Sequence, residues 1–176
     1  MCKPISAIVT ETSLHMFPEL TNSHELLLKM LGVKATKNQH LKYVKVEYCP
    51  DKDEFYGDIS KYVLRLDQDE APVWWNDRKE AVEAELREIV TKHIVTDERE
   101  CIVGNWWILC DKAHVQEVHN CNIFFMLDSS KINNIYNNSQ VGIMRNNSQI
   151  GTMGDNSRVC TLHDNKPIRF DKREKK

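Results

Sequence analysis

The sequence predicts an α+β head followed by a short β-solenoid, a β-helix or β-roll built from nine-residue repeats. The main observation is a period of nine that divides the chain from Asn122 into NIFFMLDSS, KINNIYNNS, QVGIMRNNS, QIGTMGDNS and RVCTLHDNK. The chain before this array lacks the period and carries strand and helix patterns instead. We therefore expect a mixed α/β head over 1–110, solenoid repeats over 111–169 and a basic disordered tail over 170–176.

The first strands and the first helix of the head follow from local patterns. Residues 5–10 and 13–17 are expected to pair as a β-hairpin. Asn22 is the expected N-cap of a helix, because Glu25 follows three places later as in a capping box. This helix is expected to stop at Gly32, since glycine favours the left-handed conformation that often ends helices.

The rest of the head continues with two strands and a longer helix. Alternation predicts strands over 42–49 and 60–67, the first with Val44, Val46 and Tyr48 on one face and the second with Tyr62, Leu64 and Leu66. A helix is expected over 77–93 with Asn76 as its N-cap. Its buried stripe would be Val82, Leu86, Ile89, Val90 and His93. Residues 100–110 are expected to return to extended structure.

Each repeat contributes two apolar side chains, three positions apart, that should point inward. One unit cannot bury such a pair, but stacked units can. A shortened repeat is expected from Val115. The predicted repeat core consists of Ile123, Met126, Ile132, Ile135, Val141, Met144, Ile150, Met153, Val159 and Leu162.

Polar corners separate these apolar pairs. Asn, Asp and Ser bond their own backbone and tolerate the left-handed conformation that tight turns need. Two units would make a two-sided coil of about 18 residues and three a triangular coil of about 27. About six units give only two triangular turns, which favours the two-sided form. The predicted corners are Asn138, Asn147, Asn156 and Asn165.

Several segments of the chain resemble a known group of proteins. These are ISAIVT, NSHELL, KYVKVEY and DISKYVLRLDQDEAPVWW, followed by a helix and the Asn-rich repeats. The layout is similar to an uncharacterised family encoded by bacteriophages and related bacterial genomes. The resemblance implies an N-terminal α/β region, a C-terminal β-solenoid and a phage-encoded accessory role in the host bacterial cytosol. It carries over no catalytic residue.

Composition excludes several classes of protein. Residues 47–100 hold 16 Asp/Glu against 8 Lys/Arg, so we expect no direct nucleic-acid binding. No apolar run approaches the roughly 20 residues that span a bilayer, and the N-terminus does not resemble a signal peptide, so a cytoplasmic protein without membrane contact is expected. The six scattered cysteines are expected to be free thiols.

No motif in the sequence predicts catalysis, a metal or a cofactor. Ser23, His24 and Glu25 are consecutive at a helix start and point in different directions, so they cannot form a catalytic relay among themselves. No Cys/His spacing suits zinc, and the acidic loop with Asp51 and Asp58 lacks the offsets of a calcium loop. The nonapeptides also lack the Gly-Gly-x-Gly-x-Asp pattern of calcium-binding β-rolls.

We therefore expect a non-enzymatic interaction protein, an inhibitor that sequesters a host defence factor, with a protein partner and self-association as a homodimer or trimer. One alternative is an enzyme or a small-ligand or nucleotide-binding protein with a pocket at the junction of head and solenoid, where His15, His24, Asp51, Asp53 and the tryptophans are candidates. Another is a virion structural subunit. The expected binding residues are tryptophans, which are enriched in binding hot spots, and two small residues that allow close approach: Trp74, Trp75, Trp106, Trp107, Gly142 and Gly151.

Overall fold

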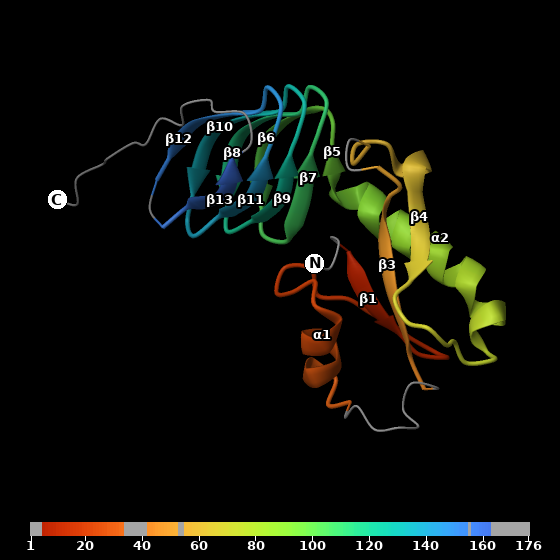
Figure 1. Cartoon of the computed structure of the whole chain (residues 1–176). Coiled ribbons are helices and arrows are strands. Elements are labelled where there is room, and N and C mark those ends of the chain that lie inside the picture. Colours follow the sequence, from red (N-terminus) through yellow and green to blue (C-terminus); the bar gives the residue numbers. More distant parts are fainter. Residues whose placement is uncertain (1–4, 34–41, 53–54, 155, 163–176) are drawn as a thin grey trace. The chain divides into compact units, whose positions relative to one another are not determined.

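The computed structural model describes residues 5–33, 42–52, 55–154 and 156–162. The chain divides into two compact units, Met1–Lys92 and His93–Lys176, which Figure 1 shows as a mixed α/β unit and a β-solenoid. The predicted fold class, an α+β region followed by a solenoid, is confirmed.

Unit 1 is built on a four-stranded antiparallel sheet with the order β2-β1-β3-β4. The predicted hairpin is present, with Ile8 opposite His15. Val44, Val46 and Tyr48 are fully buried, as the alternation predicts, but Leu66 is exposed at the end of its strand. The strands are β1 (Ser6–Val9), β2 (Leu14–His15), β3 (Val44–Pro50) and β4 (Tyr62–Leu66), with a 3-10 helix, η2 (Ile59–Lys61), before β4.

Helix α1 (His24–Met30) begins at a different cap from the one predicted. Ser23, not Asn22, is the N-cap, and its side chain accepts a hydrogen bond from the Leu26 amide. The Asn22 Oδ1 atom instead accepts from the Ile5 amide, 3.3 Å away, so a tertiary contact takes the side chain that the local pattern assigned to the helix. Gly32 has a φ of 68°, and the helix ends before it as predicted.

Helix α2 (Trp75–His93) begins two residues before the predicted start. The Trp74 carbonyl accepts the first helical hydrogen bond from the Arg78 amide, so Asn76 lies inside the first turn and is not the cap. The buried residues of α2 are Trp75, Val82, Leu86 and Val90, whereas Ile89 and His93 are half-buried.

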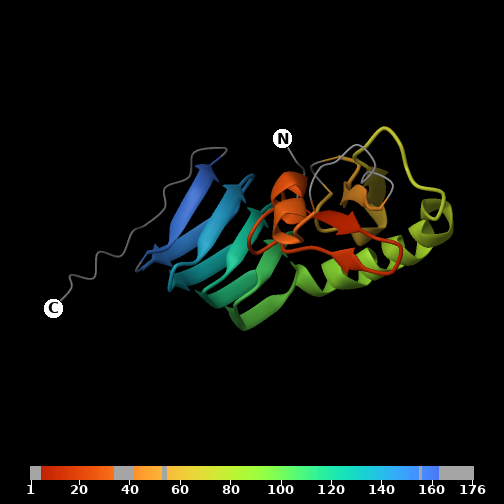
Figure 2. The ribbon, with the colours of Figure 1, turned by 90° about the horizontal axis from the view of Figure 1, so that it is seen from below.

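Unit 2 is a two-sided solenoid of two parallel sheets. Each strand pairs with the next strand but one, so the chain alternates between the sheets, and Figure 2 shows the successive rungs side by side. This confirms the two-sided coil. The first solenoid sheet has the order β12-β10-β8-β6, from β6 (Glu98–Val103), β8 (His114–His119), β10 (Lys131–Tyr136) and β12 (Gln149–Met153). The second has the order β13-β11-β9-β7-β5, from β5 (Ile94–Val95), β7 (Trp106–Leu109), β9 (Asn122–Met126), β11 (Gln140–Met144) and β13 (Arg158–Leu162).

The solenoid begins earlier than the predicted boundary at 110/111. Ile94 already pairs in parallel with Ile108, across the shortest turn of the coil. The next turns grow longer, because Arg99 pairs with Val115 and Val115 pairs with Ile132. From Ile123 onward a turn equals two full repeats, as from Ile123 to Val141 and from Ile132 to Ile150. The first rungs therefore lack the nine-residue period, although they belong to the same coil.

The predicted repeat core lies inside the solenoid. The inward pairs of β9 to β12, from Ile123 to Met153, are at most 5% exposed and form one cluster with residues of the earlier rungs. In the last strand Val159 is half-buried and Leu162 is 47% exposed, so the core prediction is wrong for Leu162. Leu162 pairs with Met144 on one side, and the residues that follow it lie outside the described part of the chain.

The left-handed corner residues lie one position earlier than predicted. Asp128, Asn137 and Asn146 have φ between 54° and 59°. Of the predicted corners, Asn138 also has a positive φ of 59°, whereas Asn147 does not. Asn165 and residue 155, which precedes the predicted corner Asn156, lie outside the described residues. At each of these corners a serine amide donates a hydrogen bond to the carbonyl three residues earlier, as the Ser139 amide does to the Tyr136 carbonyl.

Candidate functional site

The outer face of the first solenoid sheet is an open, polar surface. Between the two inward residues of each strand, two adjacent residues face outward, and another follows at the strand end. None of these outward residues is buried in β6, β8, β10 or β12. The outward set includes Glu98, Glu100, Cys101, His114, Gln116, Glu117, His119, Lys131, Asn133, Asn134, Tyr136, Gln149 and Thr152.

Lateral hydrogen bonds order this face from rung to rung. Asn133 donates through Nδ2 to the Gln116 side chain, and its Oδ1 lies 3.1 Å from His114 Nε2. One column along, the Thr152 hydroxyl donates to Asn134 Oδ1 at 2.5 Å. These side chains already have fixed neighbours, so binding a partner here costs less rotamer entropy than on a surface of free side chains.

Cys101, Glu117 and His119 bring a thiol, a carboxylate and an imidazole together on this face, and we call them the Cys101 cluster. The ladder places Cys101 directly beside Glu117, and His119 follows two residues later on the same strand. One ligand atom from each lies within 4.8 Å of the other two, and His119 Nε2 is 3.2 Å from Glu117 Oε2. Cys101 and Glu117 are exposed and His119 is half-buried.

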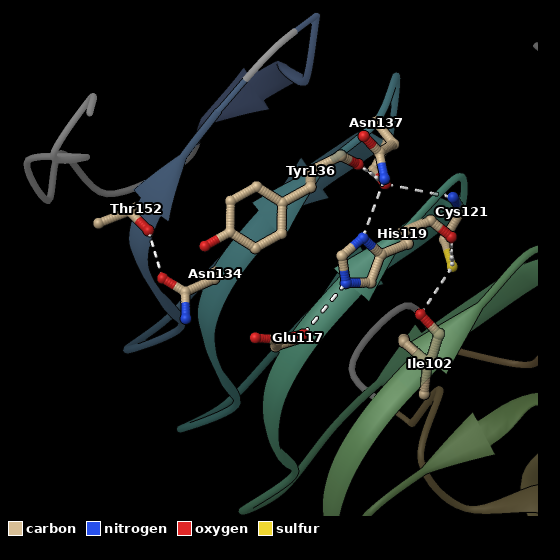
Figure 3. Close-up of polar contacts among 9 residues, drawn as sticks. Ile102, Glu117, His119, Cys121, Asn134, Tyr136, Asn137 and Thr152 are labelled. Atoms are coloured by element: carbon tan, nitrogen blue, oxygen red, sulfur yellow. Dashed lines mark hydrogen bonds and ion pairs between the residues drawn. The ribbon is translucent and has the colours of Figure 1, made fainter. Parts of the chain in front are cut away.

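Neighbouring residues fix the His119 ring, as Figure 3 shows. The Tyr136 ring stacks on it with centroids 5.2 Å apart. On the side away from Glu117, His119 Nδ1 lies 3.1 Å from the Asn137 side-chain amide. The imidazole thus presents Nε2 to the cluster and Nδ1 to Asn137.

Cys121 lies near the cluster but is chemically different from Cys101. It is 3% exposed, and its Sγ approaches the carbonyls of Ile102, Gly104 and His119 at 3.2 to 3.5 Å (Figure 3). Burial raises the pKa of Cys121 to about 11, so its thiol stays protonated at neutral pH. The cysteines of the described residues form no disulfide, as predicted.

The predicted tryptophans are divided between the two units. Trp74 and Trp75 belong to unit 1, and Trp106 and Trp107 to unit 2. Trp75 and Trp106 are buried, while Trp74 and Trp107 are half-buried. Trp106 stacks between His93 and Phe124, with centroid separations of 4.2 and 5.4 Å. A binding role for these residues stays a prediction.

Gly142 and Gly151 have an architectural reason to be small. A Cβ added to Gly151 would lie 2.6 Å from the Asn133 carbonyl oxygen, and one added to Gly142 would lie 2.9 Å from that of Phe124. The backbones of neighbouring rungs therefore approach too closely for a side chain at either position. This contact explains both glycines without a partner, and their predicted role in binding stays untested.

The remaining candidates have local structural partners. His24 is 4% exposed, with Nε2 2.9 Å from the Val46 carbonyl and Nδ1 2.8 Å from Asp67 Oδ2. Asp51 pairs with Arg65. Hydrogen bonds from the Ser60 side chain and amide lower the pKa of Asp58, which caps the 3-10 helix. Asp53 lies outside the described residues.

Two cavities lie within unit 1. One of about 290 Å³ is lined by polar residues that include Lys45 and Asp69. The other, of about 420 Å³, is lined by Ile8, Thr10, His15, Leu31, Gly32, Val33, Lys42 and Tyr43. Of the residues predicted for a ligand pocket, His15 therefore lines this cavity.

Comparison with known proteins gives no matching family model, no matching curated protein and no matching solved structure. The α/β region and the solenoid that the resemblance implies are present, but no comparison supports the family or a phage origin. Among the described residues, neither helix has the length and apolar character needed to cross a bilayer.

The Cys101 cluster is not apparent in the sequence. The spacing 101, 117 and 119 matches no metal motif, because the residues meet through a full turn of the coil and not through a local sequence pattern. Extending the 18-residue register one rung before Val115 would have placed Arg99 beside Glu117, because the shorter turn that brings Cys101 there is not visible in the sequence.

Proposed function

We propose that the protein is a non-enzymatic interaction protein that binds a protein partner through the outer face of the first solenoid sheet. The observation that carries this proposal is the row of exposed and half-buried side chains on this face, which hydrogen bonds link from β8 through β10 to β12. The residues of this face stand side by side on four hydrogen-bonded strands, and such an extended surface suits a macromolecule better than a small ligand, which usually binds in a concave pocket.

The size of the face sets the expected affinity. Four strands about 4.8 Å apart and roughly 18 Å long cover roughly 350 Å². A stable interface takes about 800 Å² from each partner, so this face alone falls in the size range of weak, transient contacts. The resemblance to phage-encoded proteins supports a bacterial host factor as the partner, with inhibition or sequestration as the result.

The test compares partner recovery between matched surface variants of the tagged chain. Asn134→Arg places a long cation in the centre of the proposed face, while Thr161→Arg places the same group at an exposed position of the second sheet. A partner cross-linked to wild type and to Thr161→Arg, but not to Asn134→Arg, supports the proposal. Equal recovery by both variants refutes it, and native mass reports self-association in the same samples.

A second candidate function rests on the cavity at His15. Its volume of about 420 Å³ falls within the range of small-molecule sites, about 300 to 1,000 Å³. A small molecule that copurifies with the chain and is lost on His15→Ala would favour ligand binding in unit 1. The same molecule retained by His15→Ala would exclude this cavity as its site.

A further inference from the structure

The Cys101 cluster brings together a thiol, a carboxylate and an imidazole. We propose that Cys101, Glu117 and His119 bind a zinc-like divalent transition-metal ion. The strand ladder and not a local motif creates this set, because Cys101 and Glu117 are paired neighbours on β6 and β8. The inference is independent of the proposed partner binding, so either can fail alone.

The donor types select the class of metal. Sulfur, imidazole nitrogen and carboxylate oxygen together suit Zn²⁺ and similar transition metals, whereas Mg²⁺ and Ca²⁺ prefer sites made of oxygen. A thiolate and a carboxylate carry two negative charges, which balance one divalent ion. The exposed carboxylates of Glu98 and Glu100 on the same strand as Cys101 add attraction for a cation.

The geometry needs only side-chain adjustment. Tetrahedral zinc with ordinary bond lengths places its donor atoms about 3.4 to 3.6 Å apart. The donor atoms here lie within 4.8 Å of one another, and the Glu117–His119 pair is at 3.2 Å. The three residues stand on strands of one sheet, so their backbones hold the cluster in place.

Asn137 orients the His119 ring through the nitrogen that faces away from the proposed ion. A ligating histidine usually donates its other ring N–H to a carbonyl or carboxylate oxygen. Asn137 lies on the Nδ1 side of His119, and rotating its amide by 180° presents Oδ1 as the acceptor. This arrangement leaves the Nε2 lone pair directed at the ion, while Tyr136 holds the plane of the ring.

The cluster supplies three protein ligands and leaves a position open to solvent. Cys121 does not complete the set, since its buried thiol faces backbone carbonyls. Three ligands with water in the fourth position is the pattern of accessible zinc sites. A thiol–imidazole nucleophile is less well supported, because it would need a substrate pocket, and the linings of the cavities described above include neither Cys101 nor His119.

The test titrates Co²⁺ and then Zn²⁺ into the full chain, purified without a polyhistidine tag. We expect one Co²⁺ per chain with a thiolate-to-cobalt charge-transfer absorption, which Zn²⁺ displaces. Cys101→Ser should abolish the absorption, and Cys160→Ser should keep it, because Cys160 is an exposed thiol of the second sheet. His119→Gln should weaken Zn²⁺ binding by more than about 100-fold, because loss of a ligand costs more than the 10- to 100-fold effect of changing a residue that only orients a ligand. His114→Gln should leave Zn²⁺ binding unchanged.

Two further measurements keep the proposal testable if a ligand variant fails to fold. Asn137→Gly keeps a residue that tolerates the φ of 54° and should weaken Zn²⁺ binding about 10-fold. In wild type, Zn²⁺ should slow alkylation of Cys101 but not of Cys160. A charge-transfer absorption that persists in Cys101→Ser, equal Zn²⁺ affinity in His119→Gln, or no protection of Cys101 would each overturn the proposal.

Discussion

Three glycines of the solenoid allow a graded test of how closely the rungs pack. Gly151→Ala would put a Cβ 2.6 Å from the Asn133 carbonyl oxygen, and Gly142→Ala would put one 2.9 Å from the Phe124 carbonyl oxygen. Both neighbours are backbone atoms of the preceding turn. In Gly154→Ala the nearest atom is Tyr136 Cδ1 at 3.1 Å, which belongs to a side chain that can move.

The expected free-energy changes follow from these contacts. Overpacking in a well-packed region costs about 1 to 3 kcal/mol, whereas replacing glycine by alanine returns about 0.4 to 1 kcal/mol by restricting the unfolded chain. We therefore expect Gly151→Ala to destabilise unit 2 by about 1 to 2 kcal/mol and Gly142→Ala by less. Gly154→Ala should stay within about 0.5 kcal/mol of wild type, as is usual for a substitution that creates no fixed clash.

Thermal unfolding with hydrogen exchange would measure these differences. A loss of about 1 kcal/mol lowers the Tm of a unit this small by about 4 to 8 °C, and exchange should rise in β10 and β12 of Gly151→Ala. A Gly154→Ala protein less stable than Gly151→Ala would show that backbone contacts between rungs do not set the cost of these substitutions. If Gly151→Ala keeps normal stability but loses partner binding, Gly151 contacts the partner, as the sequence predicts.

The other predictions concern the core, a buried thiol and a helix cap. Ile135→Ala should cost about 2 to 5 kcal/mol in denaturant unfolding because Ile135 is fully buried, and the outward Ile143→Ala less than half as much. At pH 8 iodoacetamide should modify Cys101 and spare Cys121, whose pKa burial raises to about 11; peptide mass mapping showing equal labelling would contradict this. Ser23→Ala should cost about 1 kcal/mol and raise hydrogen exchange in α1, and unchanged exchange would mean that the cap contributes nothing.

The repeat could be predicted because one physical requirement recurs every nine residues. A two-sided coil must bury two side chains per strand, so Ile132 and Ile135 have counterparts at Ile150 and Met153 one turn later. The same requirement holds at Val115 and Val118, but their turn is one residue shorter. The change in spacing hid the first rungs and moved the predicted boundary to 110/111.

The caps and corners show where local patterns were insufficient. Asn22 and Ser23 are both good N-cap residues, and the choice between them depended on the contact of Asn22 with the Ile5 amide. At the corners, the left-handed position falls on Asn137 and also on the predicted Asn138. Consecutive Asn residues suit either position, so composition alone does not fix it.

The candidate site could not be predicted because its residues are close only across the sheet. Cys101 lies in a rung without the Asn-rich pattern, and His119 precedes the repeat that the period identifies. Pairing Cys101 with Glu117 requires the shorter register of that turn. The surface that carries the proposed function is therefore visible only once the strands are aligned.

If the outer face of the first solenoid sheet is the functional surface, a partner must cover it in the cell. Hydroxyl-radical footprinting of the chain, purified and in extract of the producing cells, would detect this cover. A chelator in both samples removes any protection that comes from bound metal. We expect Tyr136 and His119 to lose oxidation in the extract while β13 does not. Equal oxidation of Tyr136 and His119 in both samples, or protection confined to unit 1, would contradict it.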